Sequence, residues 1–322
     1  MRRKAKESEN KYMNERNETL ISIKNLTKRY GNFTAVDHLS FDVKCGTMIG
    51  FLGVNGAGKS TTINMLSTLL KPDEGEVNIG GAFLGKDDRK IREMIGVVYQ
   101  QNVLDELLSV KENILIRAAM TGVDNDTAAV RLKEMSELLK LGDILNKKYK
   151  LLSGGQKRRC EIAVALIHAP KILFLDEPTT GLDPATRIDV WNAVKSLREN
   201  RNMTVFLTTH YMEEAATADK IIIIDKGVKL AEGSPFELKE IYAKDRLRLH
   251  FSETYTDKIE EALTLKIPVK DFQKTSGEIE VFIENSLSAI PLLETLKPYL
   301  KGFEVIQGNM DDVFLNVTKE NE

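Results

Sequence analysis

The residues with the clearest capacity for chemistry form a glycine-rich stretch that begins at Gly53. Its spacing of glycine, four residues and Gly-Lys-Ser is typical of a phosphate-binding loop, in which successive backbone N–H groups point at phosphate oxygens. In that role Lys59 would reach the β- and γ-phosphates, and the Ser60 hydroxyl would hold Mg²⁺. The sequence therefore predicts a nucleoside triphosphate site made of Gly53, Val54, Asn55, Gly56, Ala57, Gly58, Lys59, Ser60, Thr61 and Thr62.

Two adjacent carboxylates, Asp176 and Glu177, follow the apolar run 171–175. Such a run predicts a buried strand, and at the end of a strand both side chains can reach the edge of the sheet. Asp176 would bind Mg²⁺, usually through water, and Glu177 would orient or deprotonate the attacking water. A polar turn before Pro178 is the plainer alternative.

Three further side chains stand where a ligand could meet them. Tyr30 precedes a glycine in a predicted turn, so it could stack on a nucleobase, but a core or edge tyrosine fits equally well. Gln100 and His210 follow the predicted strands 95–99 and 203–209, which puts both at the carboxyl edge of the predicted sheet, where ligands bind. His210 is a candidate sensor of the γ-phosphate, although a lone histidine is more often structural.

Two helices begin with capping residues. The stretch from Ser153 to Gln156 precedes a predicted helix over 157–169, and from the residues alone an ordinary N-cap explains it as well as a phosphate site does. The next predicted helix follows Gly181 and Leu182, with Asp183 as its cap and Pro184 at its first position.

Regular elements must carry these residues. A buried strand over 47–52 should lead into the loop, and a helix over 61–70, ended by Pro72, should follow it. A capping box at Ser109 and Glu112 opens a helical region that runs to residue 150, in which a stripe over 128–139 reads as core. The remaining expected strands are 20–28 and 40–44 around a turn at Gly31 and Asn32, then 75–79, 221–225 and 228–231.

A second series of predicted strands and helices begins near residue 245. The pattern predicts strands over 246–251, 269–275, 278–283 and 303–306, with a turn at 276–277, and helices over 256–265, 288–300 and 311–318. The order βαββαβ is that of ferredoxin-like domains. We expect an accessory α+β domain over 241–322, with no chemistry of its own.

Composition excludes several classes of protein. A formal net charge of −2 and a pI near 6.2 leave no basic surplus for nucleic acid. Cys45 and Cys160 lack the paired spacing of a disulfide framework or a zinc site, which suits a reducing compartment. No apolar run approaches the ~18 residues of a membrane span. Residues 1–18 mix acids and bases without an apolar core, so we expect a disordered tail rather than a signal peptide, with a membrane tether as the weaker alternative.

Taken together, residues 20–240 resemble the nucleotide-binding subunits of ABC transporters, because six motifs occur in that family's order. Val54 occupies a position where the family often has proline. Because the phosphates are bound by backbone N–H groups, the loop should tolerate this difference. The tail over 311–315 further resembles the daunorubicin-resistance type of exporter ATPase. The six motifs are base-stacking Tyr30, the phosphate loop, the Q-loop residue Gln100, the signature Leu152-Ser153-Gly154-Gly155-Gln156, the Asp176-Glu177 pair and the switch His210, and Asp183 matches the D-loop.

The resemblance implies a fold, a reaction and partners. The fold is α/β: a P-loop NTPase core over 19–240, with an antiparallel β-subdomain and a helical insert at about 102–152, plus the ferredoxin-like domain. The reaction is ATP hydrolysis with Mg²⁺, in which Lys59, Gln100, Glu177 and His210 are catalytic and Ser60, Gln100 and Asp176 lie at the metal.

The resemblance also implies a dimer. Two identical or homologous subunits would pack head to tail, so that Ser153, Gly154, Gly155, Gln156 and Asp183 of one face the ATP of the other. The pair would drive a transmembrane permease subunit, in the direction of export, on the inner face of the cell membrane. A soluble ABC ATPase acting on nucleic acid, ribosomes or protein assembly is the alternative, disfavoured by the single cassette and the lack of a long coiled coil. A non-catalytic regulator is disfavoured by the intact catalytic residues.

Overall fold

The computed structural model describes residues 18–320, except 267–271 and 276. Residues 1–17 of the expected N-terminal tail, the start of the strand predicted over 269–275 and the serine of the turn at 276 lie outside these residues. The chain divides into two compact units between Glu232 and Gly233, and each unit is described here by itself. No helix in the described part combines the length and the apolar character needed to cross a bilayer.

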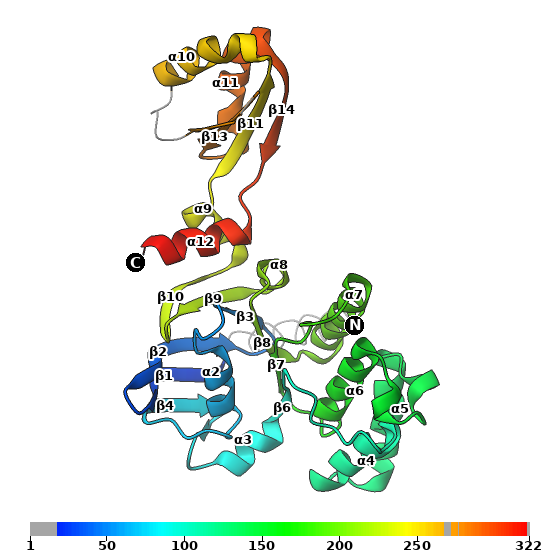
Figure 1. The fold of residues 1–322 in the computed structure, drawn as a ribbon. Helices are drawn as coiled ribbons and strands as arrows, with labels where there is room; N and C mark the ends of the chain where they lie inside the picture. Colours follow the sequence, from blue (N-terminus) through cyan, green and yellow to red (C-terminus); the bar gives the residue numbers. More distant parts are fainter. Residues whose placement is uncertain (1–17, 267–271, 276, 321–322) are drawn as a thin grey trace, which may run out of the picture. The chain divides into compact units, whose positions relative to one another are not determined.

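A six-stranded sheet is the centre of the first unit (Figure 1). Its order is β10-β9-β3-β8-β7-β6, and the five strands from β9 to β6 run parallel. Their carboxyl ends therefore meet at one edge of the sheet, where open α/β sheets bind ligands. The strands are β3 (Met48–Leu52), β6 (Ile95–Val98), β7 (Ile172–Asp176), β8 (Thr204–Thr209), β9 (Lys220–Asp225) and β10 (Val228–Gly233).

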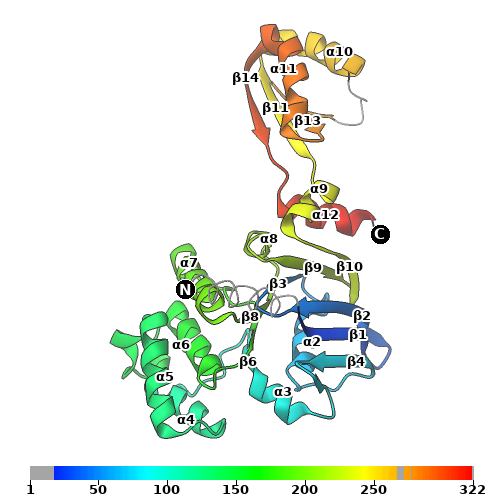
Figure 2. The ribbon, with the colours of Figure 1, turned by 180° about the vertical axis from the view of Figure 1, so that it is seen from behind.

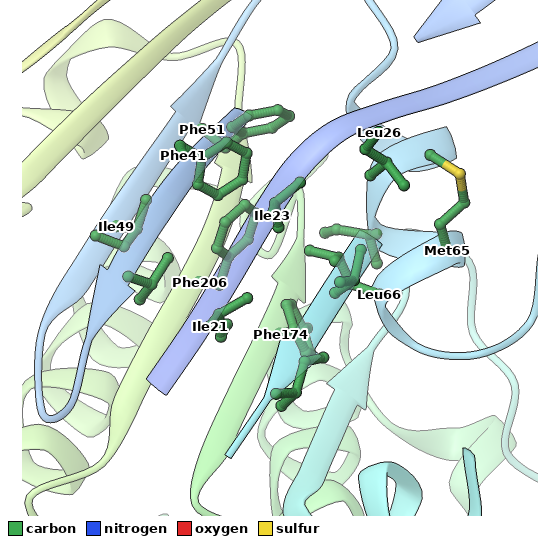
Figure 3. Packing of buried hydrophobic residues seen from close by; sticks show 14 of the residues in the cluster. Ile21, Ile23, Leu26, Phe41, Ile49, Phe51, Met65, Leu66, Phe174 and Phe206 are labelled. Carbon is green, nitrogen blue, oxygen red and sulfur yellow. The ribbon is translucent and has the colours of Figure 1, made fainter. Parts of the chain in front are cut away.

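An antiparallel sheet, the predicted β-subdomain, packs on this core through apolar side chains. Its order is β2-β1-β4-β5. Ile21, Ile23 and Phe41 point toward the aromatic centre of the parallel sheet, where the rings of Phe51 and Phe206 lie 5.3 Å apart (Figure 3). Helix α2 contacts strands of both sheets, and this fixes the end of the phosphate loop. The strands are β1 (Thr19–Tyr30), β2 (Phe33–Lys44), β4 (Glu74–Ile79) and β5 (Ala82–Phe83).

Helix α2 (Lys59–Leu66) is shorter than the helix predicted over 61–70, and it begins earlier. Thr68 adopts a left-handed φ of 65°, and the N–H groups of Leu69 and Leu70 turn back to the carbonyl of Asn64. Together with the bond from the Thr68 N–H to the carbonyl of Met65, these bonds satisfy carbonyls of the last turn, and the helix ends before Pro72 is reached. Helix α3 (Asp88–Met94) follows the antiparallel sheet.

The predicted helical insert at about 102–152 is confirmed by two helices, and the helix that begins just after it, at Gly154, gathers with them (Figures 1 and 2). Ser109 and Glu112 form the predicted capping box. The apolar stripe is narrower than expected, because Val130 is 60% exposed while Leu132 and Met135 are buried. The helices are α4 (Val110–Met120), α5 (Asn125–Leu138) and α6 (Gly154–Leu166), with 3₁₀ turns at Gly142–Ile144 and Tyr149–Leu151; α7 (Pro184–Arg201) and α8 (Met212–Ala215) belong to the core.

The second unit confirms the ferredoxin-like order, with an antiparallel sheet arranged β12-β13-β11-β14. Two helices, α10 and α11, contribute Ile259, Leu263 and Leu292 to its apolar core. Helix α9 packs on α12, so it belongs to this unit, and the division therefore falls before α9 rather than at residue 240. The elements are α9 (Pro235–Tyr242), β11 (Asp245–Phe251), α10 (Thr256–Lys266), β12 (Phe272–Thr275), β13 (Glu278–Ile283), α11 (Ala289–Leu296), β14 (Leu300–Ile306) and α12 (Met310–Glu320), with 3₁₀ turns at Glu253–Tyr255, Ser286–Ser288 and Lys297–Tyr299.

Candidate active site

The predicted phosphate loop joins β3 to α2, and its glycines are needed for close packing as well as for its curve. Gly58 has a φ of 103°, and a Cβ there would lie 2.4 Å from the carbonyl oxygen of Ala35. A Cβ on Gly53 would lie 2.6 Å from the carbonyl oxygen of Ile224. Side chains at these positions would push the loop away from β2 and β9, so the backbone can take this path only as glycine.

The first turn of α2 faces the loop with its N–H groups uncapped. No side chain caps the helix at Gly58, and its first turn carries no acidic residue. Unpaired N–H groups and the positive end of the helix dipole favour an anion at this place. Thr62 is fully buried and donates its hydroxyl to the carbonyl of Gly58 at 2.9 Å, so it supports the loop from inside.

Lys59 is the buried cation of the loop. Its Nζ donates to the carbonyls of Gly53 at 2.7 Å and Val54 at 3.1 Å, and it lies 3.6 Å from Oε1 of Glu177. Burial lowers the pKa of this ammonium, and the charges of Glu177 and Asp176 oppose that shift. The ammonium is held by carbonyl oxygens that a phosphate can replace.

Oxygen ligands for a hard cation meet beside the loop. The Ser60 hydroxyl lies 3.4 Å from Oδ1 of Asp176, and Thr208 donates its hydroxyl to the same oxygen at 2.5 Å. Mg²⁺ prefers one or two protein oxygens and keeps the remaining positions for water and phosphate. A hydroxyl and a buried carboxylate at this spacing fit that donor set.

One carboxylate oxygen of Glu177 lies close to two of the predicted polar side chains, Gln100 and His210, and to Thr180, which was not predicted. This oxygen, Oε2, accepts from Nε2 of Gln100 at 3.2 Å and from the Thr180 hydroxyl at 3.1 Å. Nδ1 of His210 lies 3.3 Å from the same oxygen, a separation typical of ion pairs but without hydrogen-bond geometry. The structure thus brings together Gln100, Glu177 and His210 from three different strand ends.

The signature and D-loop residues form a separate group at the starts of α6 and α7. Ser153 and Gln156 make a reciprocal capping box, and Asp183 accepts from the N–H of Thr186 at 3.0 Å. Gly155 has no room for a side chain, because a Cβ there would lie 1.9 Å from Cγ2 of Thr186. Within the described residues, no hydrogen bond or ion pair joins this group to the phosphate loop of the same chain.

Tyr30 lies at the tip of the β1–β2 hairpin. Its ring is 51% exposed, which excludes the core alternative, and Nζ of Lys28 lies 5.7 Å from the ring centroid. The same hairpin contributes Ala35, which packs against Gly58 of the loop. An aromatic ring with this exposure can stack on a nucleobase.

Comparison with known proteins identifies the family. The model of the ABC transporter family matches residues 36–180. The chain is 36% identical over 313 residues to the daunorubicin/doxorubicin resistance ATP-binding protein DrrA of Streptomyces peucetius, covering 95% of this chain and 94% of that protein. This chain is an ABC-transporter ATP-binding subunit.

Two further comparisons agree with this assignment. The chain is 37% identical to the Nod factor export ATP-binding protein I of Burkholderia lata, over 92% of this chain and 96% of that protein. The solved ATP-binding cassette MJ0796, a post-hydrolysis dimer bound to ADP and Pi, is 31% identical with a TM-score of 0.60, over 66% of this chain and 98% of that chain. This ABC subunit is therefore an ATPase, and the soluble alternative is not favoured.

Residue patterns did not single out several groups that support the ATPase site. Thr208 and Thr209 are buried polar residues at the carboxyl end of β8, and this position at the ligand-binding edge could have indicated the contact of Thr208 with Asp176. Gly227, in the β9–β10 turn, donates its N–H to the carbonyl of Ala57 at 3.1 Å, a long-range contact with no local signal. Arg158 is a buried charge on α6, and its partner Glu161 one turn later was the available clue.

Proposed function

We propose that this ATPase drives export through a separate transmembrane subunit on the inner face of the cell membrane. The similarity to export and resistance ATPases extends over nearly the whole chain, including the second unit, and supports this direction. The observation that carries the ATPase part of the proposal is the convergence of Lys59, Gln100, Glu177 and His210 beside an anion-binding loop. Such a site can hydrolyse ATP and respond to the loss of its γ-phosphate.

The proposed chemistry assigns one task to each side chain. Glu177 accepts a proton from the attacking water, and Gln100 and His210 orient that water and the γ-phosphate. Lys59 exchanges its carbonyl partners for phosphate oxygens. Ser60 and Asp176 hold Mg²⁺, which when bound neutralises charge on the phosphates.

The signature would act across a head-to-tail dimer. Because no hydrogen bond or ion pair joins Ser153 or Gly154 to the phosphate loop of the same chain in the described residues, we assign them to the nucleotide of the partner subunit. The N-terminus of α6 would then bring N–H groups and the Ser153 hydroxyl to the phosphoryl oxygens, as preorganised donors. ATP would bind the closed pair more tightly than ADP does, and this difference drives the cycle.

A cavity beside the Q-loop offers a place for the membrane subunit. It has a volume of about 1070 Å³ and is lined from β6, the segment after Gln100 and helix α4. Three of its apolar side chains are largely exposed: Val103 at 65%, Ile116 at 47% and Met120 at 75%. We assign this groove to a segment of the permease, because Tyr99, which lines it, is bonded in sequence to Gln100.

Purification from membranes tests the proposed function. A tagged chain is extracted with mild detergent from membranes of its own cells, with and without ATP, and the proteins that co-purify are identified. A polytopic membrane protein whose recovery falls in an Ile116→Asp variant supports the proposal. Recovery of only ribosomal, nucleic-acid-bound or assembly proteins contradicts it.

A further inference from the structure

Arg158 lies on α6, shortly after the signature, and its side chain is almost completely buried at 7% exposure. It donates to three main-chain carbonyls from outside its own helix. Nε bonds the carbonyl of Pro178 at 2.6 Å, Nη1 bonds that of Tyr99 at 2.6 Å, and Nη2 bonds that of Glu177 at 2.9 Å. One planar group therefore joins two catalytic segments that are far apart in the sequence.

The guanidinium is itself fixed from the other side. Nη1 also donates to Oε2 of Glu161 at 2.8 Å, and the Tyr149 hydroxyl donates to Oε1 of the same carboxylate at 2.6 Å. Glu161 is 5% exposed, so the two charges are buried together. A buried pair adds little net stability by itself, but when fully hydrogen-bonded it holds its neighbours in one arrangement.

The bonded carbonyls belong to the residues that need exact placement. Tyr99 precedes Gln100, and Glu177 has a left-handed φ of 46°, which a non-glycine residue keeps only when its surroundings impose it. The side chains of Gln100 and Glu177 meet 3.2 Å apart. The relative position of these two side chains therefore depends on backbone that Arg158 holds.

We propose that Arg158 is a positioning residue for ATP hydrolysis, which fixes Gln100 and Glu177 relative to helix α6. This inference rests on the catalytic role proposed for Glu177. Since α6 begins with the signature, a displacement of the signature segment is passed through Arg158 to the carboxylate of the same subunit.

The test uses the full-length chain with the paired substitution Arg158→Met and Glu161→Gln, which removes both buried charges together. We expect kcat to fall roughly 10- to 100-fold, as misplaced catalytic groups do, while KM for ATP and nucleotide affinity stay near their original values. Arg158→Lys should recover part of the rate, because it keeps the charge beside Glu161 and can reach one carbonyl.

Arg159→Met is the matched control. Arg159 also donates to main-chain carbonyls, those of Leu139 at 3.1 Å and Lys140 at 3.2 Å, but these belong to a segment without a proposed catalytic residue. It should keep the original kcat. Unchanged kcat in the folded paired variant overturns the inference, and so does a loss of nucleotide affinity that matches the loss of rate. If the paired variant does not fold, the same criteria apply to Arg158→Lys. Normal hydrolysis by Glu177→Gln would instead refute the role of Glu177.

Discussion

Glu177 is crowded for a general base, because its buried carboxylate faces Gln100, Thr180, His210 and Lys59. Glu177→Gln keeps the shape of the side chain but cannot accept the proton of the water. We expect nucleotide binding to persist while hydrolysis falls at least ~10²-fold, the usual effect of losing a general base. Turnover and bound nucleotide are measured on the same preparation, and normal turnover would exclude Glu177 as the base.

Lys59→Ala should instead weaken nucleotide binding. The buried ammonium is the cation nearest the expected phosphates, so its removal weakens binding itself, by roughly the 10- to 100-fold expected from losing a charge-assisted hydrogen bond. Equilibrium dialysis with labelled ATP measures the change. Unaltered affinity would mean that the phosphates are bound by the loop backbone alone.

The two cysteines should differ sharply in reactivity. Burial raises the pKa of the Cys160 thiol to about 12, with a further contribution from Glu161, so at pH 8 this thiol stays protonated and unreactive. Cys45 is partly exposed. We expect iodoacetamide to label Cys45 alone in the native protein and both after denaturation, as read by peptide mass. Native labelling of Cys160 would show that α6 opens readily.

At the scale of elements, the packing of α6 against α7 leaves different amounts of room for a side chain at the two signature glycines. A Cβ at Gly155 would lie 1.9 Å from Thr186, whereas a Cβ at Gly154 would lie 3.2 Å from the end of the Leu182 side chain. Gly155→Ala should therefore destabilise the protein by about 1–3 kcal/mol through overpacking, and Gly154→Ala much less. Urea unfolding of the two variants measures the difference, and equal stabilities would contradict the packing.

Most elements that carry the site could be predicted, because local signals mark them. The apolar run before Asp176, the capping box at Ser109 and the glycine spacing of the loop all depend on neighbours in the sequence. The end of α2 and the bonds of Arg158 do not. They depend on a left-handed Thr68 and on carbonyls of distant segments, which no local pattern encodes.

The start of the second unit was missed for a similar reason. Helix α9 follows β10 directly and reads as a continuation of the first domain, but it packs on α12 near the other end of the chain. Only this tertiary contact assigns helix α9 to the second unit. The narrowed stripe of α5 has the same origin, since apolar Val130 has no partner surface and stays exposed.

At the scale of the whole molecule, we propose that residues 233–322 support assembly rather than chemistry. The first unit holds all the catalytic contacts and has its own apolar core. A chain ending at Ser234, which keeps β10 complete, should therefore bind ATP with unchanged affinity. Equilibrium dialysis checks this. Loss of binding by a truncated chain that folds would mean that the second unit helps to build the site.

A mixed dimer tests the shared site. Lys59→Ala damages the loop, and Gly154→Asp places a carboxylate at the signature without the clash with Thr186 that Gly155 would produce. Each variant alone should fail to occlude ATP: Lys59→Ala removes the cation that binds the phosphates in both sites, and Gly154→Asp brings a carboxylate that repels them in a water-poor site. In a mixed dimer, one ATP site contains both substituted segments, and the other pairs an intact phosphate loop with an intact signature. About one ATP per dimer should therefore be trapped. No trapped ATP in proven mixed dimers would refute a shared site.

The position of β3 in the sheet also limits when the domain can fold during its synthesis. The strand that leads into the phosphate loop lies between β8 and β9, which are made much later in synthesis. Until Lys220–Asp225 leaves the ribosome, β3 lacks a neighbour on at least one edge, and Gly53 lacks the carbonyl of Ile224 against which it packs. Such non-local pairing is slow and leaves strand edges open to aggregation. We therefore expect nucleotide to stabilise the domain only after β9 has been made.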